Sequence, residues 1–161
     1  MICKTEIKML KKYIVILIIA AIIFSICYYF IEKNNNTINI KYEENVIVGI
    51  PENIPEEMGY DSIFVEEGYE IALCGYPSKV EERLEAYITN NQENNVWIVV
   101  KKYDSNDNKV GETGIIKQGE YVKDIKLNKE LSAGNITIKI IAYEPNTFES
   151  RGNIAFKTII K

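Results

Sequence analysis

The stretch Val96 to Tyr103, VWIVVKKY, decides the fold of this chain of 161 residues. Its first five residues are all apolar, which is typical of a strand in the middle of a sheet with both faces covered. Polar, turn-forming residues bound it on both sides, NNQENN at 90–95 and DSNDNK at 104–109. We therefore expect a central β-strand here, followed by a hairpin turn.

Segments on either side of this strand alternate between apolar and polar residues. In the segment 136–142, Ile136, Ile138 and Ile140 share one face, while Thr137 and Lys139 lie on the other. A period of two, or a short apolar run, also marks 45–50, 70–74, 84–88, 110–116, 121–127 and 154–160. This spacing predicts an all-β domain at residues 45–161, an immunoglobulin-like β-sandwich of about 7–8 antiparallel strands.

Trp97 lies on the third long strand, where immunoglobulin-like sandwiches bury a Trp between their sheets. The disulfide that joins the two sheets of antibody domains has no counterpart, because Cys74 is the only Cys after residue 33. We interpret Cys74 as a buried, small apolar side chain; an intermolecular disulfide and a reactive thiol are the alternatives.

Residues 52–68 are rich in turn-forming residues and in acids. Pro51, Pro55, Gly59 and Gly68 punctuate the segment, and only the short piece 63–65 is apolar, so we expect the least regular part of the domain here. Loops of this length often carry binding sites. The candidate partner-binding residues are Glu52, Glu56, Glu57, Asp61, Glu66, Glu67 and Glu70; the alternative is that these acids only solvate the surface.

The charge of the domain is uneven along the sequence. Residues 43–93 hold 13 acidic and 2 basic residues, whereas residues 94–161 hold 11 basic and 8 acidic ones. The acidic half disfavours nucleic acid as a partner and favours a basic protein partner or the cationic groups of a cell wall.

An apolar run, YIVILIIAAIIFSICYYFI at residues 13–31, precedes the domain and contains no charged residue, Pro or Gly in its nineteen positions. As a helix it would be roughly 28 Å long, about the thickness of the hydrocarbon core of a bilayer. Four lysines precede it, Lys4, Lys8, Lys11 and Lys12, so the positive-inside rule places the N-terminus in the cytoplasm. We expect a basic cytoplasmic tail at 1–12, a transmembrane helix at 13–31, a polar linker at 32–44 and an extracellular domain at 45–161.

Two processing alternatives compete with a permanent anchor. A cleaved secretory signal ends in small residues of an A-x-A pattern, which this run lacks. A lipoprotein signal has Gly, Ala or Ser before its Cys, whereas Ile26 precedes Cys27. We therefore predict a single-pass cell-membrane protein that keeps its helix.

The residue types exclude several kinds of chemistry. The chain has no His, so Ser-His-Asp and Cys-His catalysis and His-ligated zinc are absent. Asp104, Asn106 and Asn108 occupy alternate positions of a calcium loop, but Lys109 stands where that loop needs Gly, so we interpret them as a hairpin turn. Pairs of adjacent Glu residues, which could supply glycosidase carboxylates, are interpreted as solvated surface. We expect no enzyme activity, no cofactor and no metal.

Two segments, TNNQENNVWIVV at 89–100 and IIKQGEYVKDIKLNKELSAGNITIKIIAY at 115–143, carry a resemblance to a known group. They resemble small membrane-anchored exported domains of Gram-positive bacteria, some of them encoded on conjugative elements. The shared features are an Asn-rich turn before an aromatic strand and the Leu-x3-Leu step of Leu127 and Leu131; Gln118 stands where that group has Pro, and Ile136 where it has Tyr. The resemblance covers residues 84–143 and implies structural turns and core positions, with no catalytic residues.

These observations together predict a non-catalytic, membrane-anchored binding module with protein partners in the membrane or envelope. The first hypothesis is an accessory subunit of a cell-envelope assembly such as a conjugation or secretion apparatus. The alternatives are a surface domain that binds cell-wall polymer or an external ligand, and a structural spacer.

Overall fold

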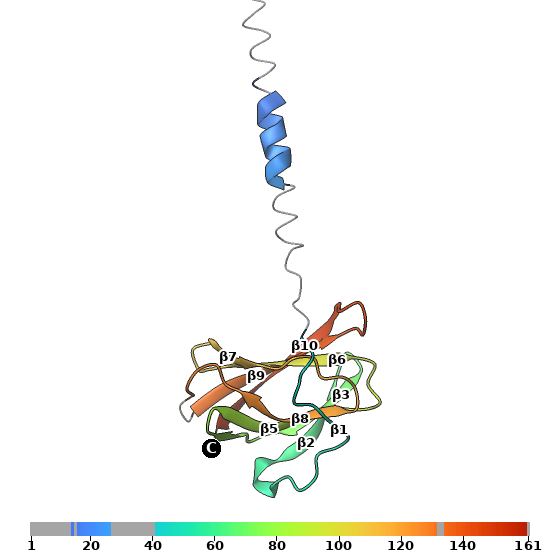
Figure 1. Ribbon diagram of the computed structural model, residues 1–161, viewed down its shortest axis with the longest axis vertical. Helices are drawn as coiled ribbons and strands as arrows, with labels where there is room; N and C mark the ends of the chain where they lie inside the picture. The colour runs from blue at the N-terminus through green and yellow to red at the C-terminus, as the bar shows by residue number, and fades with distance from the viewer. Residues whose placement is uncertain (1–13, 15, 27–40, 132–133, 161) are drawn as a thin grey trace, which may run out of the picture. The chain divides into compact units, whose positions relative to one another are not determined.

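The computed structural model describes residues 14, 16–26, 41–131 and 134–160 (Figure 1). The chain divides into two compact units, Met1–Asn39 and Ile40–Lys161. In the first unit, residues 16–26 are α-helical, while Tyr13, Val15 and residues 27–31 of the predicted span lie outside the described residues. Within the described part of the chain, no helix has the length and apolar character needed to cross a membrane.

The second unit is an all-β sandwich, as predicted, built from two antiparallel sheets (Figure 1). The six-stranded sheet has the order β1-β8-β5-β3-β2, with β4 paired to β5, and the four-stranded sheet has the order β10-β9-β6-β7. The described residues thus form ten strands rather than seven or eight: β1 (Ile47–Val48), β2 (Tyr60–Val65), β3 (Tyr69–Cys74), β4 (Ser78–Val80), β5 (Arg83–Asn90), β6 (Trp97–Tyr103), β7 (Lys109–Glu112), β8 (Glu120–Lys126), β9 (Gly134–Tyr143) and β10 (Ser150–Ile160).

One hydrophobic core lies between the two sheets. The alternation in the sequence fills it: Leu84, Ala86 and Ile88 of β5 are buried in the same cluster as Ile138 and Ile140 of β9. Strand β10 follows the predicted alternation, because Ile154 and Phe156 pack on this core, while the residues that alternate with them along the strand are exposed. Burial of these faces accounts for the fold, since apolar burial is the largest favourable contribution to folding.

Strand β6 corrects one prediction. It is central in its sheet and apolar on both faces, as expected, but Trp97 is only half-buried and lies outside the core. Ile98 and Val100 face the core instead. The alternation explains this outcome, because Val96, Ile98 and Val100 of the run VWIVV point inward and Trp97 points to the opposite face.

Two other strands depart from the predicted pattern. Strand β7 ends at Glu112, and Ile116 pairs instead with Ile98, so the predicted strand 110–116 bends away partway along. In β5, the pairing with β8 shifts between Glu85 and Ile88, and Tyr87 there has a φ of 41°. Tyr87 faces away from the main core, as the period of two requires, but it is 8% exposed because it packs with Met58 and Cys74.

The segment 51–68 is more regular than predicted. It contains a 3₁₀ helix, η1 (Glu56–Met58), followed by β2, which pairs along its whole length with β3. Met58, Cys74 and Tyr87 form a second small apolar cluster, against which Ile54 also packs. Cys74 is fully buried in this cluster, as predicted, and burial raises the pKa of its thiol to about 12, with a smaller contribution from Glu85.

Two buried amides join the sheets at the turn that precedes β6. Asn90 is fully buried, and its side-chain amide donates hydrogen bonds to the carbonyl oxygens of Val96 and Ile116, at 2.9 and 3.2 Å. Asn94 donates to the side-chain oxygen of Asn90 and to the backbone oxygen of Glu70, both at 2.6 Å. The Asn-rich turn predicted at 90–95 is therefore a buried polar network that fixes the start of β6.

Candidate functional site

The seven acidic residues predicted to bind a partner fall into two groups. Four lie around η1 and the start of β2, namely Glu52, Glu56, Glu57 and Asp61; Glu66 and Glu67 lie at the turn between β2 and β3, and Glu70 lies at the start of β3. Along β2, Asp61 lies roughly 17 Å from Glu66 and roughly 10 Å from Phe64, the residue that pairs with Glu70. The structure therefore does not gather the seven residues into one cluster.

Glu70 differs from the other six because it has a structural role. Its carboxylate accepts a hydrogen bond of 2.8 Å from the side chain of Asn91, and its backbone N–H donates to the side-chain oxygen of Asn94. The remaining six acids are exposed, and within the described residues none of them takes part in an ion pair.

Strand β2 is an edge strand of the six-stranded sheet and presents an aromatic side chain to solvent. Phe64 is 73% exposed, and it lies on the outer face, directly opposite Glu70 of β3. Asp61 hydrogen-bonds the backbone N–H of Ser62, and Glu66 and Glu67 follow at the turn. Asp61 lies on the opposite face of β2 from Phe64, because it pairs with the core residue Leu73. We call Phe64, Glu66 and Glu67 the acidic edge.

The outer face of the four-stranded sheet carries the opposite charge. Lys101 of β6 lies directly opposite Lys139 of β9, and Lys157 of β10 is the diagonal neighbour of Lys139, because its own partner is Thr137. Lys101 pairs with Glu112 at 3.2 Å, whereas in the described part of the chain Lys139 and Lys157 form no ion pair. We call Lys101, Lys139 and Lys157 the lysine face.

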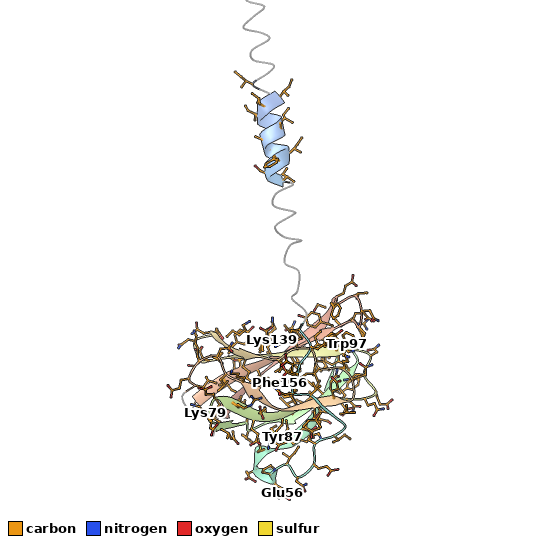
Figure 2. All side chains as sticks on the ribbon, viewed as in Figure 1. Glu56, Lys79, Tyr87, Trp97, Lys139 and Phe156 are labelled. Atoms are coloured by element: carbon orange, nitrogen blue, oxygen red, sulfur yellow. The ribbon has the colours of Figure 1, made fainter. Side chains whose placement is uncertain are left out.

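Like charges placed directly opposite each other in a sheet are destabilising, so the pair of Lys101 and Lys139 favours an anion above it. Figure 2 shows Lys139 and Trp97 along one side of the domain and Glu56 at the opposite side, with the core residue Phe156 between them. The acids around η1 and the lysine face therefore lie on opposite sides of the sandwich.

Beside the lysine face, aromatic side chains gather at one corner of the sheet. The ring of Trp97 lies 5.8 Å from that of Tyr42 and 5.6 Å from that of Phe148, measured between centroids. The ammonium of Lys117 stands 4.7 Å from the centre of the Tyr42 ring, and the indole N–H of Trp97 donates to Gln118 at 2.9 Å. We call these five residues the aromatic corner.

Phe148 reaches this corner through an unusual backbone conformation. It has a φ of 58°, a left-handed conformation that bulky side chains rarely adopt. Its N–H donates to the carbonyl of Glu144, whose N–H in turn donates to the carbonyl of Glu149, so the loop between β9 and β10 holds the residue in place. Backbone strain of this kind is concentrated at sites of binding and catalysis, which makes the corner a candidate binding site.

The chain enters the domain at the same corner. Lys41 and Glu43 exchange backbone hydrogen bonds with Ile115, at 2.8 and 3.0 Å, and Tyr42 is placed between them. A Cβ on Gly114 would lie 2.4 Å from the backbone nitrogen of Glu43, so Gly is required for this close approach. The end of the predicted linker 32–44 is therefore part of the domain.

The sequence alone did not single out the aromatic corner or the lysine face. The parts of the corner come from four separate segments of the chain, and only the placement of Trp97 on the polar side of β6 would have suggested a site. The lysines are three single residues on three strands, and the pairing register that aligns them is set by long-range contacts.

Other charged groups are engaged locally. Asp104 accepts hydrogen bonds from the side-chain amide of Asn108 and from the backbone N–H groups of Asn108 and Asn106, which lower the pKa of its carboxyl and close the predicted hairpin turn. A depression of about 660 Å³ near the turn between β4 and β5 mixes both signs of charge along its lining: Lys79, Glu81, Glu82, Lys126, Leu127, Asn128, Lys129 and Glu130. Among the described residues, no group of His, Cys, Asp or Glu side chains has the arrangement of a metal site.

Comparisons with known proteins give no further information on the function of these surfaces. No protein-family model matches the chain, and no curated protein sequence matches it. The functional conclusion therefore rests on the residues of this chain.

Proposed function

We propose that the protein is a non-catalytic, membrane-anchored binding module whose exported domain binds a protein partner in the cell envelope. The observation that carries this proposal is the acidic edge, where Phe64 is 73% exposed among acids that form no ion pair within the described residues. An exposed aromatic side chain with a charged rim is the usual form of a protein-binding hot spot.

The proposed anchor is the apolar run at residues 13–31, with the lysines before it in the cytoplasm and the domain outside the cell. Such a topology suits an accessory subunit of an envelope assembly, for example a conjugation or secretion apparatus. The partner would present an apolar pocket for Phe64 and basic groups for Glu66 and Glu67.

The strand order supports the finer assignment of an immunoglobulin-like sandwich. The order β7-β6-β9-β10 corresponds to strands C′, C, F and G of a variable-type domain, and β3-β5-β8 corresponds to A, B and E. In immunoglobulin-like domains the sheets form a rigid scaffold for surfaces that bind other proteins, which agrees with a binding role.

The proposal is tested by co-purification of the tagged full-length protein from detergent-solubilised membranes. We expect a defined set of partner proteins with the unchanged protein, and at least a tenfold loss with Phe64→Ala, because hot-spot truncations cost about 2 kcal/mol or more. Ile50→Ala is the matched control, since Ile50 is 77% exposed outside the acidic edge.

A second pair of variants separates charge from apolar contact. Glu66→Gln with Glu67→Gln should weaken the association and reduce its dependence on salt, whereas Glu81→Gln with Glu82→Gln removes the same charge elsewhere and should change neither. A version that lacks residues 1–33 should still bring down the partner. Partners that remain with every edge variant, or that require residues 1–33, would contradict the proposal.

A further inference from the structure

The aromatic corner and the lysine face form one continuous surface. Trp97, Val99 and Lys101 follow one another along the outer side of β6, and Tyr143, Ile141 and Lys139 lie opposite them in register on β9. The surface therefore grades from aromatic at one end to basic at the other.

The chain enters the domain at the aromatic end of this surface. The nine residues between Ile31 and Lys41 can extend at most about 35 Å, which is about the diameter of a folded domain of this size. If the apolar run is anchored, the aromatic corner stays within one domain diameter of the membrane surface. At such short range a tether raises the effective concentration to the millimolar range, so a weak contact is enough.

The side chains at this surface match those that proteins place at the headgroup level of a bilayer. Trp and Tyr prefer that region because their rings are apolar and their N–H and O–H groups are polar. Lysines close to an anionic membrane are attracted to it, and Lys139 and Lys157 form no ion pair among the described residues that would compete.

From these observations we propose that the lysine face and the aromatic corner dock on the anionic phospholipid headgroups of the membrane that anchors the chain. Docking on this side leaves Phe64, on the outer face of the other sheet, directed away from the lipid. The inference rests on the anchor of the proposed function and adds an orientation of the domain to it.

The test uses the full-length protein in nanodiscs made of phosphatidylcholine alone or of phosphatidylcholine with phosphatidylglycerol. Trp97 is the only Trp of the chain, so its emission reports on this corner alone. We expect a blue shift and quenching by headgroup spin-labelled lipid in the anionic nanodiscs, and loss of both in phosphatidylcholine or at high salt.

Variants then assign the effect to the lysine face. Lys139→Gln with Lys157→Gln should reduce the ratio of docked to undocked domain by about 30-fold, from about a factor of five per lysine. Lys126→Gln with Lys129→Gln removes the same charge at exposed positions outside this face and should leave the Trp97 signal unchanged.

Each other outcome overturns the inference in a distinguishable way. Equal Trp97 signals in both lipids, or equal loss with both pairs of variants, would exclude docking while the anchor of the proposed function stands. Release of the protein from membranes by alkaline carbonate would remove the anchor and the docking together. A Trp97 response to soluble anionic wall polymer but not to anionic lipid would assign the surface to that polymer instead.

Discussion

The outer faces of the two sheets differ in how far the chain itself covers them. On the six-stranded sheet, the chain covers its own surface, because residues 51–58 lie against it and Met58, Cys74 and Tyr87 form a second apolar cluster there. On the four-stranded sheet, Lys157 is exposed and Ile159 is 57% exposed, while Lys101 and Lys139 are partly exposed. Partners of the domain should therefore be sought at the edge strand β2 and on the outer face of the four-stranded sheet, while the covered outer face of the six-stranded sheet contributes to stability.

The largest loss of stability should come from truncating Met58, which packs over the outer face of the six-stranded sheet. Met58 is 3% exposed, so Met58→Ala should lower the free energy of unfolding by about 2–4 kcal/mol through lost burial and a cavity. Ile159→Ala on the open face should lower it by less than about 1 kcal/mol. Chemical denaturation of the two variants measures the difference, and equal losses would show that the first face is not covered as described.

The next effect concerns the entry of the chain at the aromatic corner. Gly114→Ala places a Cβ 2.6 Å or less from backbone atoms of Lys41, Tyr42 and Glu43, so it should cost about 1–3 kcal/mol and displace Tyr42 from Trp97. A change in Trp97 fluorescence reports the displacement. Gly75→Ala is the control, because its Cβ would lie 3.4 Å from its nearest neighbour and should be tolerated; an unchanged Trp97 signal in Gly114→Ala would contradict the described packing.

The inner side of the four-stranded sheet contains a group that favours unfolding. Lys102 is fully buried, and its ammonium has no hydrogen-bond partner among the described residues. Burial holds the pKa of Lys102 well below its usual value, against a smaller opposing influence of Asp124, while Arg83 lowers it further. In the unfolded chain the pKa returns to about 10.4, so the unfolded state binds more protons between the two values.

It follows that stability should rise with pH across this window and fall as pH drops through it toward the folded-state pKa. Lys102→Met should remove this dependence and raise the free energy of unfolding at pH 7 by roughly 1–2 kcal/mol. Urea denaturation at several pH values provides the measurement. Lys101→Met, on the outer side of the same strand, should leave the pH dependence in place; a variant Lys102→Met with an unchanged slope would refute this explanation.

The smallest expected change in the free energy of unfolding concerns Lys139 of the lysine face, and it tests whether this lysine serves stability or binding. Lys139→Gln should raise the free energy of unfolding by about 0.2–0.5 kcal/mol at low salt, because it removes the repulsion with Lys101 directly opposite. Lys157 lies opposite Thr137, so Lys157→Gln should change little. A loss of stability in Lys139→Gln would show that this lysine contributes to the fold rather than to binding.

The parts of the fold that the sequence predicted are those set by local pattern. Ile136, Ile138 and Ile140 alternate with polar residues and are buried as a strict period of two requires. The burial of Tyr87 and the strand β2 escaped the prediction, because the residues that cover Tyr87, such as Met58, are distant in sequence and because β2 leaves Asp61, Ser62 and Phe64 exposed. In β2 only Val65 is buried, so its sequence shows no clear alternation, whereas the edge strand β10 does alternate.

The candidate surfaces divide in the same way. The acids of residues 52–70 are close in sequence, so their segment could be named, but the length of β2 that separates Glu57 from Glu66 became visible only with the strand pairing. The aromatic corner depends on contacts between residues more than 50 positions apart, such as Trp97 with Tyr42 and with Phe148. No local pattern carries that information.

The most direct test of the two-sided account is photo-crosslinking in intact membranes, with a photoreactive amino acid in place of Phe64 or of Lys157. We expect discrete protein adducts from position 64, in the acidic edge, and lipid adducts from position 157, in the lysine face. Protein adducts from position 157 together with none from position 64 would contradict it.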